Sequence, residues 1–229
     1  AWTAGSATTA TTSEQCATEL KAFRRWISAI SESLPSDPRG TFFLTSSAGG
    51  VYAGSKGAPF DSRTPATPIG DYGQLNVAKE VQVNEVLGGG LAAVVGRVAN
   101  LYGPGQNTGK LQGLISRLCL ASITREPVTM FVPLDTLRDF IYVDDAAFLA
   151  LHWVDEAHAG INVRVIASGS PSSLGHVIGI TKDVIQRPIP IVHGFHQSAL
   201  AQSHDLRLRP DVDAVTKMRE LTSLPVGIR

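Results

Sequence analysis

The 229-residue sequence lacks several features that would assign it to a particular class of protein. Its 20 basic and 20 acidic side chains cancel, so no long-range electrostatic attraction to nucleic acid or to an anionic membrane is expected. Its two cysteines, Cys16 and Cys119, lie far apart, which favours two inert thiols in a reducing cytoplasm over a disulfide framework. No apolar stretch is long enough to span a bilayer, and residues 1–13 lack the pattern of a signal peptide.

Metal-binding patterns are also missing. The sequence has no C-x-x-C pair, and its six histidines have no compact ligand spacing. His193 and His196 are three residues apart, but Gly194 and Phe195 lie between them in a predicted loop. We therefore expect no metal site.

The sequence does contain a regular alternation of helices and strands. Apolar residues recur at helical spacing over 15–34 and 71–87, and short apolar runs over 41–46, 91–98 and 161–167 predict strands. Further predicted helices are 111–123, 144–157 and 172–185, and further predicted strands are 128–132 and 139–143. This alternation predicts an α/β fold with a doubly wound parallel sheet.

Composition also predicts how the chain is divided. The connection over 48–70 is rich in Gly, Pro, Ser and Thr, and the chain after about 168 is less regular. We expect residues 1–167 to form a sheet domain, with segments from about 104–135 contributing to a smaller lobe. Residues 168–229 are expected to supply most of that lobe.

A dinucleotide-binding sheet normally opens with a strand, a glycine-rich turn and a helix. No such unit is found here. The three glycines Gly88, Gly89 and Gly90 follow a predicted helix and precede a predicted strand, which is the reverse order. They are interpreted as a helix stop.

Hydroxyl side chains end the predicted strand over 41–46. Ser46 and Ser47 stand at its carboxyl end, where open α/β sheets bind ligands, and a serine there can donate a hydrogen bond to a substrate oxygen. Taken alone, two serines followed by glycines are more often an ordinary turn.

Tyr72 opens the predicted helix over 71–87. Tyrosine has a pKa of about 10 and needs a nearby cation to act as a base near neutrality. A lysine four residues later would lie on the same helical face, but that position is Asn76. Lys79 lies roughly 10 Å further along the helix axis, too far for direct contact with the phenol.

Two later segments also carry candidate polar side chains. Asn100 follows the predicted strand 91–98 and offers both an amide donor and an acceptor. Arg138 can hold a phosphate with its planar guanidinium. Asp144 or Asp145 is predicted to cap the following helix.

In their order, S-S-A-G-G-V-Y, Y-G-x-x-N-x-x-x-E, R-V-A-N-L-Y-G-P-G and R-D-F-I-Y-V-D-D resemble the signature of extended short-chain dehydrogenase/reductases. More narrowly, the chain resembles the NAD-dependent epimerase/dehydratase family that acts on nucleotide sugars. The resemblance spans about residues 2–186. Each motif alone is weak, and the ordered set is specific.

The resemblance implies roles for particular residues. Tyr72 becomes the catalytic acid/base, Ser47 its hydroxyl partner on the substrate oxygen, and Ser46 a neighbour of the nicotinamide. Asn76 occupies the position of the family lysine, where its amide keeps hydrogen bonds to the cofactor ribose but supplies no charge. The glycine-rich turn is one residue longer than in the simplest family pattern, so Ser46 and Ser47 are not ranked.

Other implied contacts lie on either side of the tyrosine. Ala4 and Gly5 would lie against the cofactor at the end of the fourth sheet strand, and Val98 is a further cofactor contact. Asn100 and Arg138 would bind the diphosphate of the nucleotide sugar. On this basis the chain begins after the first three strands, without the N-terminal glycine-rich part.

The implied function is that of an NAD- or NADP-dependent nucleotide-sugar oxidoreductase of the epimerase/dehydratase type. Ala48, Gly49 and Gly50 offer no acidic pair beside the serines, so epimerase (isomerase) or 4-keto reductase chemistry is favoured over dehydration. The alternative is a catalytically impaired homologue that binds nucleotide sugars or acts as a scaffold, because Asn76 replaces the lysine and the glycine-rich loop is absent. The sugar, the base and the choice between NAD and NADP stay open.

The resemblance also implies an assembly. Members of the family often dimerise through two helices that form a four-helix bundle. In this chain the corresponding helices are 15–34 and 71–87, so a homodimer formed through them is expected.

Overall fold

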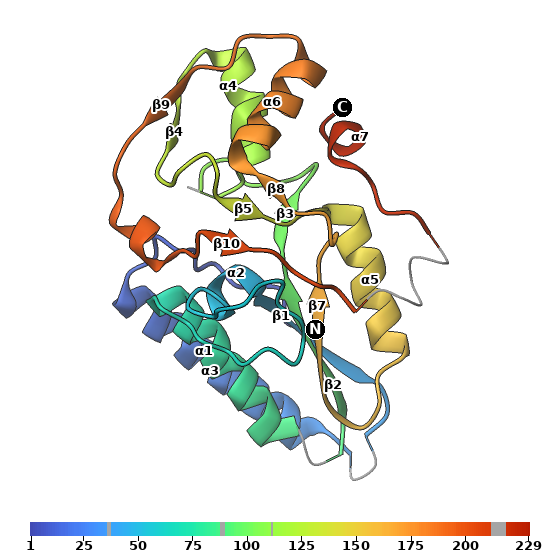
Figure 1. The fold of residues 1–229 in the computed structure, drawn as a ribbon. Coiled ribbons are helices and arrows are strands. Elements are labelled where there is room, and N and C mark those ends of the chain that lie inside the picture. Colours follow the sequence, from blue (N-terminus) through green and yellow to red (C-terminus); the bar gives the residue numbers. More distant parts are fainter. Residues whose placement is uncertain (36–37, 88–89, 111, 212–218) are drawn as a thin grey trace.

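The computed structural model describes residues 1–35, 38–87, 90–110, 112–211 and 219–229. Its central feature is a parallel sheet in the order β1-β2-β7 (Figure 1). The strands are β1 (Thr41–Ser47), β2 (Ala92–Val98) and β7 (Gly160–Ile166). The predicted α/β class and the parallel sheet are confirmed.

The first residues extend this sheet beyond β1. Trp2 forms a parallel bridge with Leu44: its backbone N–H donates to the carbonyl of Phe43 at 2.7 Å, and its carbonyl accepts from Thr45 at 3.0 Å. The segment that follows Trp2 therefore leaves the sheet at the same end as β1, which is the carboxyl end of the parallel strands.

Side chains alternate between the two faces of the sheet. Phe42 and Leu44 belong to an apolar cluster on the face covered by α1 (Ser13–Ser33) and α3 (Asp71–Leu87). Phe43, between them in the sequence, packs in a separate cluster with α5 (Val143–Asp155). Because both faces are covered, the strands are apolar along most of their length.

Helix α1 begins with a capping box. The Thr12 hydroxyl accepts from the backbone of Gln15, whose side chain accepts from the backbone of Thr12. Further along α1, Phe23 is fully buried and contacts Trp2 edge-on, with ring centroids 5.1 Å apart. Helices α1 and α3 coincide with the predicted helices 15–34 and 71–87 within two residues. The proposed stop at Gly88 and Gly89 lies outside the described residues.

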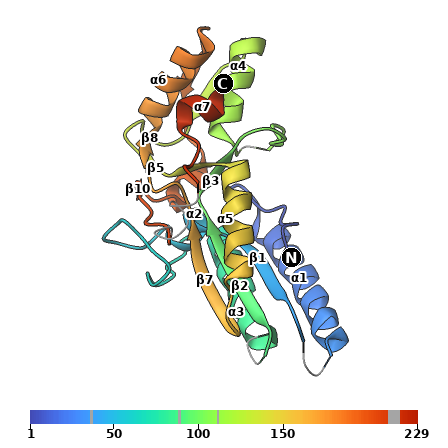
Figure 2. The ribbon, with the colours of Figure 1, turned by 90° about the vertical axis from the view of Figure 1, so that its right-hand side faces the viewer.

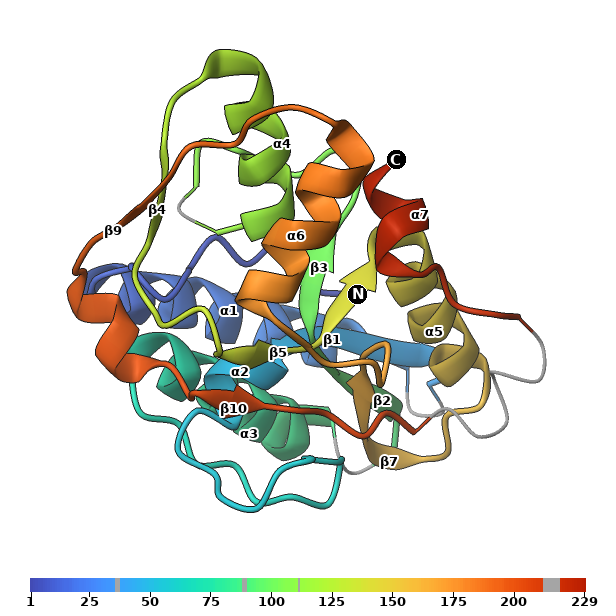
Figure 3. The same cartoon turned by 45° about the horizontal axis from the view of Figure 1, so that its top comes forward.

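A third apolar cluster lies beyond the carboxyl end of the sheet. It joins α4 (Leu114–Thr124), α6 (Leu174–Ile185) and α7 (Leu224–Ile228), as Figures 2 and 3 show. Strands β4 (Val128–Met130) and β9 (Ile191–His193) pair in parallel at its edge. Segments before and after residue 167 thus share one core in this region, and the division of the chain at 167 stays a prediction.

Short strands connect the sheet to this third cluster. β3 (Asn100–Tyr102) pairs with β6 (Phe140–Tyr142), and β5 (Leu137–Arg138) lies between β8 (Ser172–Ser173) and β10 (Asp205–Leu206). The sequence pattern did not predict β3, β5, β8, β9 and β10, which are two or three residues long. It also missed α7 and two further elements, α2 (Ala48–Val51) and the 3-10 helix η1 (Gln197–Ala201).

The predicted cap of α5 is wrong. Tyr142 is the N-cap residue, no side chain caps the helix, and Asp144 and Asp145 lie inside the first turn. The fully buried Asp145 carboxylate instead accepts from the Arg219 guanidinium at 2.8 Å and from the Thr222 backbone at 2.6 Å. It therefore anchors the segment that leads to α7.

Hydropathy separates the helices from membrane-spanning segments. Over the described part of the chain, no helix combines the length and the apolar character needed to cross a bilayer.

The packing of α1 on the sheet gives a stability prediction. Phe23→Ala removes a ring that is 0% exposed and leaves a cavity, so the free energy of unfolding should fall by about 3–5 kcal/mol. Denaturant titration checks this. Leu151→Ala is the control, because Leu151 is 66% exposed on α5 and its loss should change the value by no more than about 0.5 kcal/mol. Equal effects of the two substitutions would contradict this account of the core.

Candidate active site

The end of β1 and the start of α3 meet through two glycines. A Cβ on Gly73 would lie 2.3 Å from the carbonyl oxygen of Gly50, so only glycine permits this approach. Gly50 lies in α2, whose N-cap is Ser47 at the end of β1. The Ser47 hydroxyl accepts from the Gly50 backbone at 3.2 Å. The close contact brings Ser47 to the beginning of the helix that carries Tyr72.

Tyr72 lies in an environment that disfavours its ionised form. Burial raises the pKa of its phenol, and the Ser47 hydroxyl and Asn76 amide oppose that rise only in part. The Glu19 carboxylate adds to the rise. Asn76 is buried, and its amide donates to the Tyr72 carbonyl at 2.8 Å. The position where the resemblance implies a lysine thus supplies no cation.

Lys79 does not replace the missing charge. Its ammonium group is buried and paired with the Glu19 carboxylate of α1. The other Glu19 oxygen accepts from the Ser6 backbone, the Ser6 hydroxyl and the Ala7 backbone, each at 2.9 Å. This ion pair holds the segment after Trp2 against α1.

Ser46 faces a different group from Ser47. Its hydroxyl donates to Glu80 Oε1 at 2.5 Å, and Glu80 also accepts two bonds from Arg97, at 3.2 and 2.7 Å. Arg97 Nη1 donates to the Tyr52 hydroxyl at 2.9 Å. The network joins β1, β2, α2 and α3, and it keeps Ser46 as a donor to Glu80.

A cavity of about 410 Å³ lies at the carboxyl end of the sheet. We call it the Arg138 cavity. Six of the residues singled out from the sequence line it: Ser46, Ser47, Tyr72, Val98, Asn100 and Arg138. Ala4, Gly5 and Asn76 do not belong to its lining: Ala4 and Gly5 are exposed, and Asn76 is buried behind Tyr72. The structure thus brings four separate motifs to one cavity.

Arg138 is a buried cation in this cavity. Its guanidinium donates to the Leu137 carbonyl at 2.8 Å and to the Gln202 side chain at 3.4 Å. No carboxylate of the described residues lies within ion-pair distance, and burial lowers the pKa of Arg138 to about 10. Because a buried charge without a counterion is costly, this arrangement favours an anionic ligand.

Asn100 is oriented by Asp139. The Asn100 backbone and side-chain amides donate to the Asp139 carbonyl at 3.1 and 2.8 Å. The fully buried Asp139 carboxylate accepts from the backbone and hydroxyl of Ser168 and from the backbone of Gly169, at 2.8 to 3.0 Å. Burial nevertheless raises the pKa of Asp139 to about 6. One residue thus fixes both a cavity side chain and the turn after β7.

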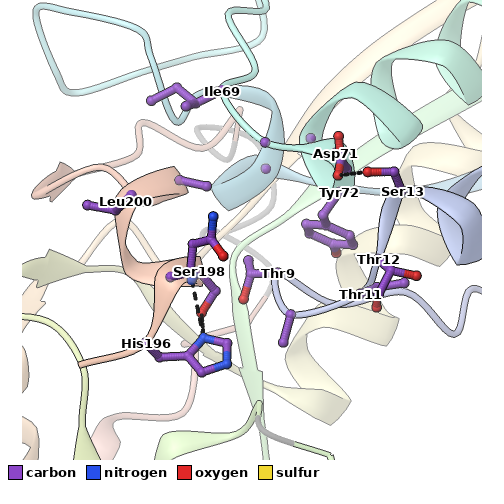
Figure 4. A pocket seen from close by; sticks show the side chains of 16 residues that line it. Thr9, Thr11, Thr12, Ser13, Ile69, Asp71, Tyr72, His196, Ser198 and Leu200 are labelled. Carbon is purple, nitrogen blue, oxygen red and sulfur yellow. Dashed lines mark hydrogen bonds between the residues drawn. The ribbon is translucent and has the colours of Figure 1, made fainter. Parts of the chain in front are cut away.

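A second cavity, of about 510 Å³, opens on another side of Tyr72. We call it the His196 cavity. Thr9 and Tyr72 line both cavities. Figure 4 shows Tyr72, Thr9 and His196 around this space, with the Ser13 hydroxyl bonded to the Asp71 carboxylate. Of the site residues singled out from the sequence, Tyr72 alone lines it.

Several lining residues carry no motif in the sequence. Arg117 of α4 lines the Arg138 cavity, and Thr9 lies in the segment before α1. His196 lies in a loop. In the sequence it could be considered only as a metal ligand, and its spacing from the other histidines does not suit that role. Arg117 could be singled out in the sequence only as a basic residue on a predicted helix. Across the described ranges, no group of three or more His, Cys, Asp or Glu side chains is arranged to hold a metal ion.

Comparison with known proteins identifies related chains. The model of the NAD dependent epimerase/dehydratase family matches residues 3–167. A dTDP-6-deoxy-L-talose 4-dehydrogenase (NAD(P)(+)) of Kitasatospora kifunensis is 30% identical over 136 residues, which cover 55% of this chain and 42% of that protein. This chain spans less than half of the length of the curated relatives that it matches.

Two solved structures share the fold. UDP-glucose 4-epimerase of Thermotoga maritima, with UDP-glucose, gives a TM-score of 0.81 at 21% identity, covering 98% of this chain and 72% of that chain. MoeE5 in complex with UDP-glucuronic acid and NAD gives 0.77 at 24% identity, covering 91% and 67%. The parallel sheet and the lobe beyond it are therefore arranged as in these proteins.

The Asp139 network gives a pH prediction. The folded protein holds the Asp139 proton to about pH 6, whereas an ordinary aspartate releases it near 3.8. Because folding favours the protonated form, the contribution of this group to stability should fall as the pH rises from about 4 to about 6. A ¹³C titration of the Asp139 carboxyl should give a midpoint near 6. In Asp139→Asn this titration should be absent, and its persistence would contradict the prediction.

Proposed function

Because the chain belongs to the NAD dependent epimerase/dehydratase family, we propose that it is an NAD(P)-dependent oxidoreductase of nucleotide sugars. The proposed reaction is hydride transfer at a sugar carbon with Tyr72 as the acid/base. The observation that carries the proposal is that Tyr72, Ser47, Asn100 and Arg138 line one cavity although they come from four segments. Within the family, epimerase or 4-keto reductase chemistry is favoured, as argued from the residues after Ser47.

The polar end of the Arg138 cavity suits a diphosphate. Arg138 supplies a buried cation that lacks an ion-pair partner among the described residues, and Arg117 lines the same space. A guanidinium binds phosphate oxygens with two parallel hydrogen bonds. Asn100, fixed by Asp139, adds a polar side chain beside them. We therefore assign the nucleoside diphosphate to this end.

Proton transfer is assigned to Tyr72. During oxidation of a sugar hydroxyl to a ketone, the oxygen loses its proton to the Tyr72 phenolate, while the carbon loses a hydride. Ser47 hydrogen-bonds the same oxygen and keeps it near the phenol. Since burial raises the pKa of Tyr72, the phenolate form is favoured only at alkaline pH.

The chain supplies residues for one end of a dinucleotide. When bound, NAD or NADP provides the acceptor and donor of the hydride. Ser46 and Val98 line the cavity next to Tyr72, and exposed Ala4 and Gly5 follow the bridge at Trp2, so these residues fit the nicotinamide end. No strand, glycine-rich turn and helix in that order occur among the described residues to hold the pyrophosphate.

One observation favours a second candidate function. Asn76 provides no charge, and the nearest lysine on the helix is neutralised by Glu19. A homologue that binds nucleotide sugars without turning them over would need the Arg138 cavity but not an ionisable tyrosine. The two candidates differ in whether turnover occurs and whether it depends on Tyr72.

Three other expectations accompany the proposed function. The homodimer formed through α1 and α3, the division of the chain at residue 167 and the cytoplasmic location stay predictions. In support of the homodimer, α1 and α3 pack side by side, and Val81 of α3 is 49% exposed.

The tyrosine assignment predicts the effect of Tyr72→Phe. Turnover of a nucleotide sugar in the presence of NAD or NADP should fall by about 10²–10⁴-fold, because the acid/base is lost, while binding stays within about threefold. Rates and calorimetric binding measure the two. Tyr142→Phe is the control, since Tyr142 lines neither cavity. An unchanged rate in Tyr72→Phe would overturn the proposal, and absent turnover in the native sequence would favour the binding homologue.

The missing lysine predicts the effect of Asn76→Lys. A cation one turn from Tyr72 should lower the pKa of the phenol, so the pH of half-maximal rate should move down by about one unit. A pH–rate profile measures this. Asn84→Lys places the same charge on an exposed part of α3 and should leave the profile in place. Coincident profiles for native and Asn76→Lys proteins would refute the role assigned to this position.

A further inference from the structure

The His196 cavity has a lining unlike that of the Arg138 cavity. It contains hydroxyl groups from Thr9, Thr11 and Ser13, the carboxylate of Asp71, and no lysine or arginine. The Arg138 cavity contains two arginines. The two cavities share Tyr72 and Thr9 in their linings, so they adjoin at the proposed reacting group.

His196 offers a defined donor to this cavity. Its Nδ1 atom accepts from the Ser198 backbone N–H at 3.2 Å and lies 2.7 Å from the Ser198 hydroxyl. Because a backbone N–H always donates, Nδ1 carries no proton in the neutral ring, and the proton lies on Nε2. The ring also packs against Phe131 in a tilted arrangement, with ring centroids 5.3 Å apart.

Small residues allow the segments that line the His196 cavity to pack closely. A Cβ on Gly70 would lie 2.8 Å from the Cβ of Ala201, so η1 packs directly against the start of α3. The Ser13 hydroxyl donates to Asp71 at 2.6 Å and ties α1 to the same point. Three segments far apart in the sequence thus form one built surface that no predicted cofactor or diphosphate residue other than Tyr72 shares.

We infer that the His196 cavity binds the end of the sugar remote from its diphosphate, and that it selects an uncharged, hydroxyl-bearing substituent there. This inference rests on the proposed function. A pyranose whose anomeric diphosphate meets Arg138 and whose reacting carbon meets Tyr72 directs its opposite edge beyond Tyr72. That edge meets the hydroxyls, the His196 N–H and the Asp71 carboxylate.

The charge of Asp71 determines what is rejected. With one carboxylate and no lysine or arginine in the lining, a carboxylate on the sugar would meet a like charge. A hydroxymethyl group instead finds both donors and acceptors. Selection is therefore expected against sugar acids and in favour of neutral sugars.

Three nucleotide sugars that differ at one carbon test this inference by calorimetry. UDP-xylose has no substituent at that carbon, UDP-glucose has a hydroxymethyl group and UDP-glucuronic acid has a carboxylate. UDP-glucose should bind about fivefold more tightly than either of the others, at low ionic strength. Higher salt should reduce the discrimination against the acid, because Asp71 is exposed to solvent.

Two substitutions assign the selectivity to the cavity. Asp71→Asn keeps an acceptor for Ser13 and should bring UDP-glucuronic acid to within about twofold of UDP-glucose. Asp144→Asn removes an equivalent exposed carboxylate from the first turn of α5 and should change nothing. His196→Phe keeps the ring on Phe131 and should remove the preference for UDP-glucose over UDP-xylose.

The outcomes separate this inference from the proposed function. If UDP and the three sugars bind with equal affinity, or if UDP-glucuronic acid binds most tightly, the role of the His196 cavity is overturned while nucleotide binding stands. If selectivity survives both Asp71→Asn and His196→Phe, it does not arise in this cavity. If neither UDP nor any of the sugars binds, the proposed function fails and the inference fails with it.

Discussion

The buried ion pair between Arg97 and Glu80 joins the middle strand of the sheet to the helix that carries Tyr72. Removing either partner would leave an uncompensated charge in the core, so the pair fixes where α3 lies on β2. Ser46 and Tyr52 complete its hydrogen bonds and add β1 and the turn after α2. Tyr72 lies about 12 Å earlier along the same helix, and its position follows from this attachment.

The long elements of the fold could be predicted because their signals are local. Helical spacing marked α1 and α3, and short apolar runs marked β1 and β2. The cap of α5 could not be predicted correctly, because Asp145 bonds to Arg219, 74 residues away, rather than to its own helix. Gly50, one of the two glycines that made α2 hard to predict, also lets this helix approach α3.

Much of the candidate site was also accessible from sequence, since parallel strands deliver their carboxyl ends to one place. That rule accounts for Ser47 after β1 and Asn100 after β2, whereas Arg138 reaches the same cavity from β5, outside the main sheet. The His196 cavity was not accessible, because its walls come from a segment before α1 and a 3-10 helix without a motif. Lys79 could be excluded as a partner of Tyr72 by helix length, but its actual partner, Glu19, is 60 residues away.

The edge of β1 that faces away from β2 can pair with another extended segment. β2 pairs with β1 over seven residues on one side, whereas on the other side the described residues contribute a bridge from Trp2. Alternate backbone amides and carbonyls of β1 therefore form an edge to which another extended segment can add. Phe42, Phe43 and Leu44 are buried on the two faces of the sheet, so a strand added at this edge, from the same sheet or from a foreign chain, would bond through its backbone.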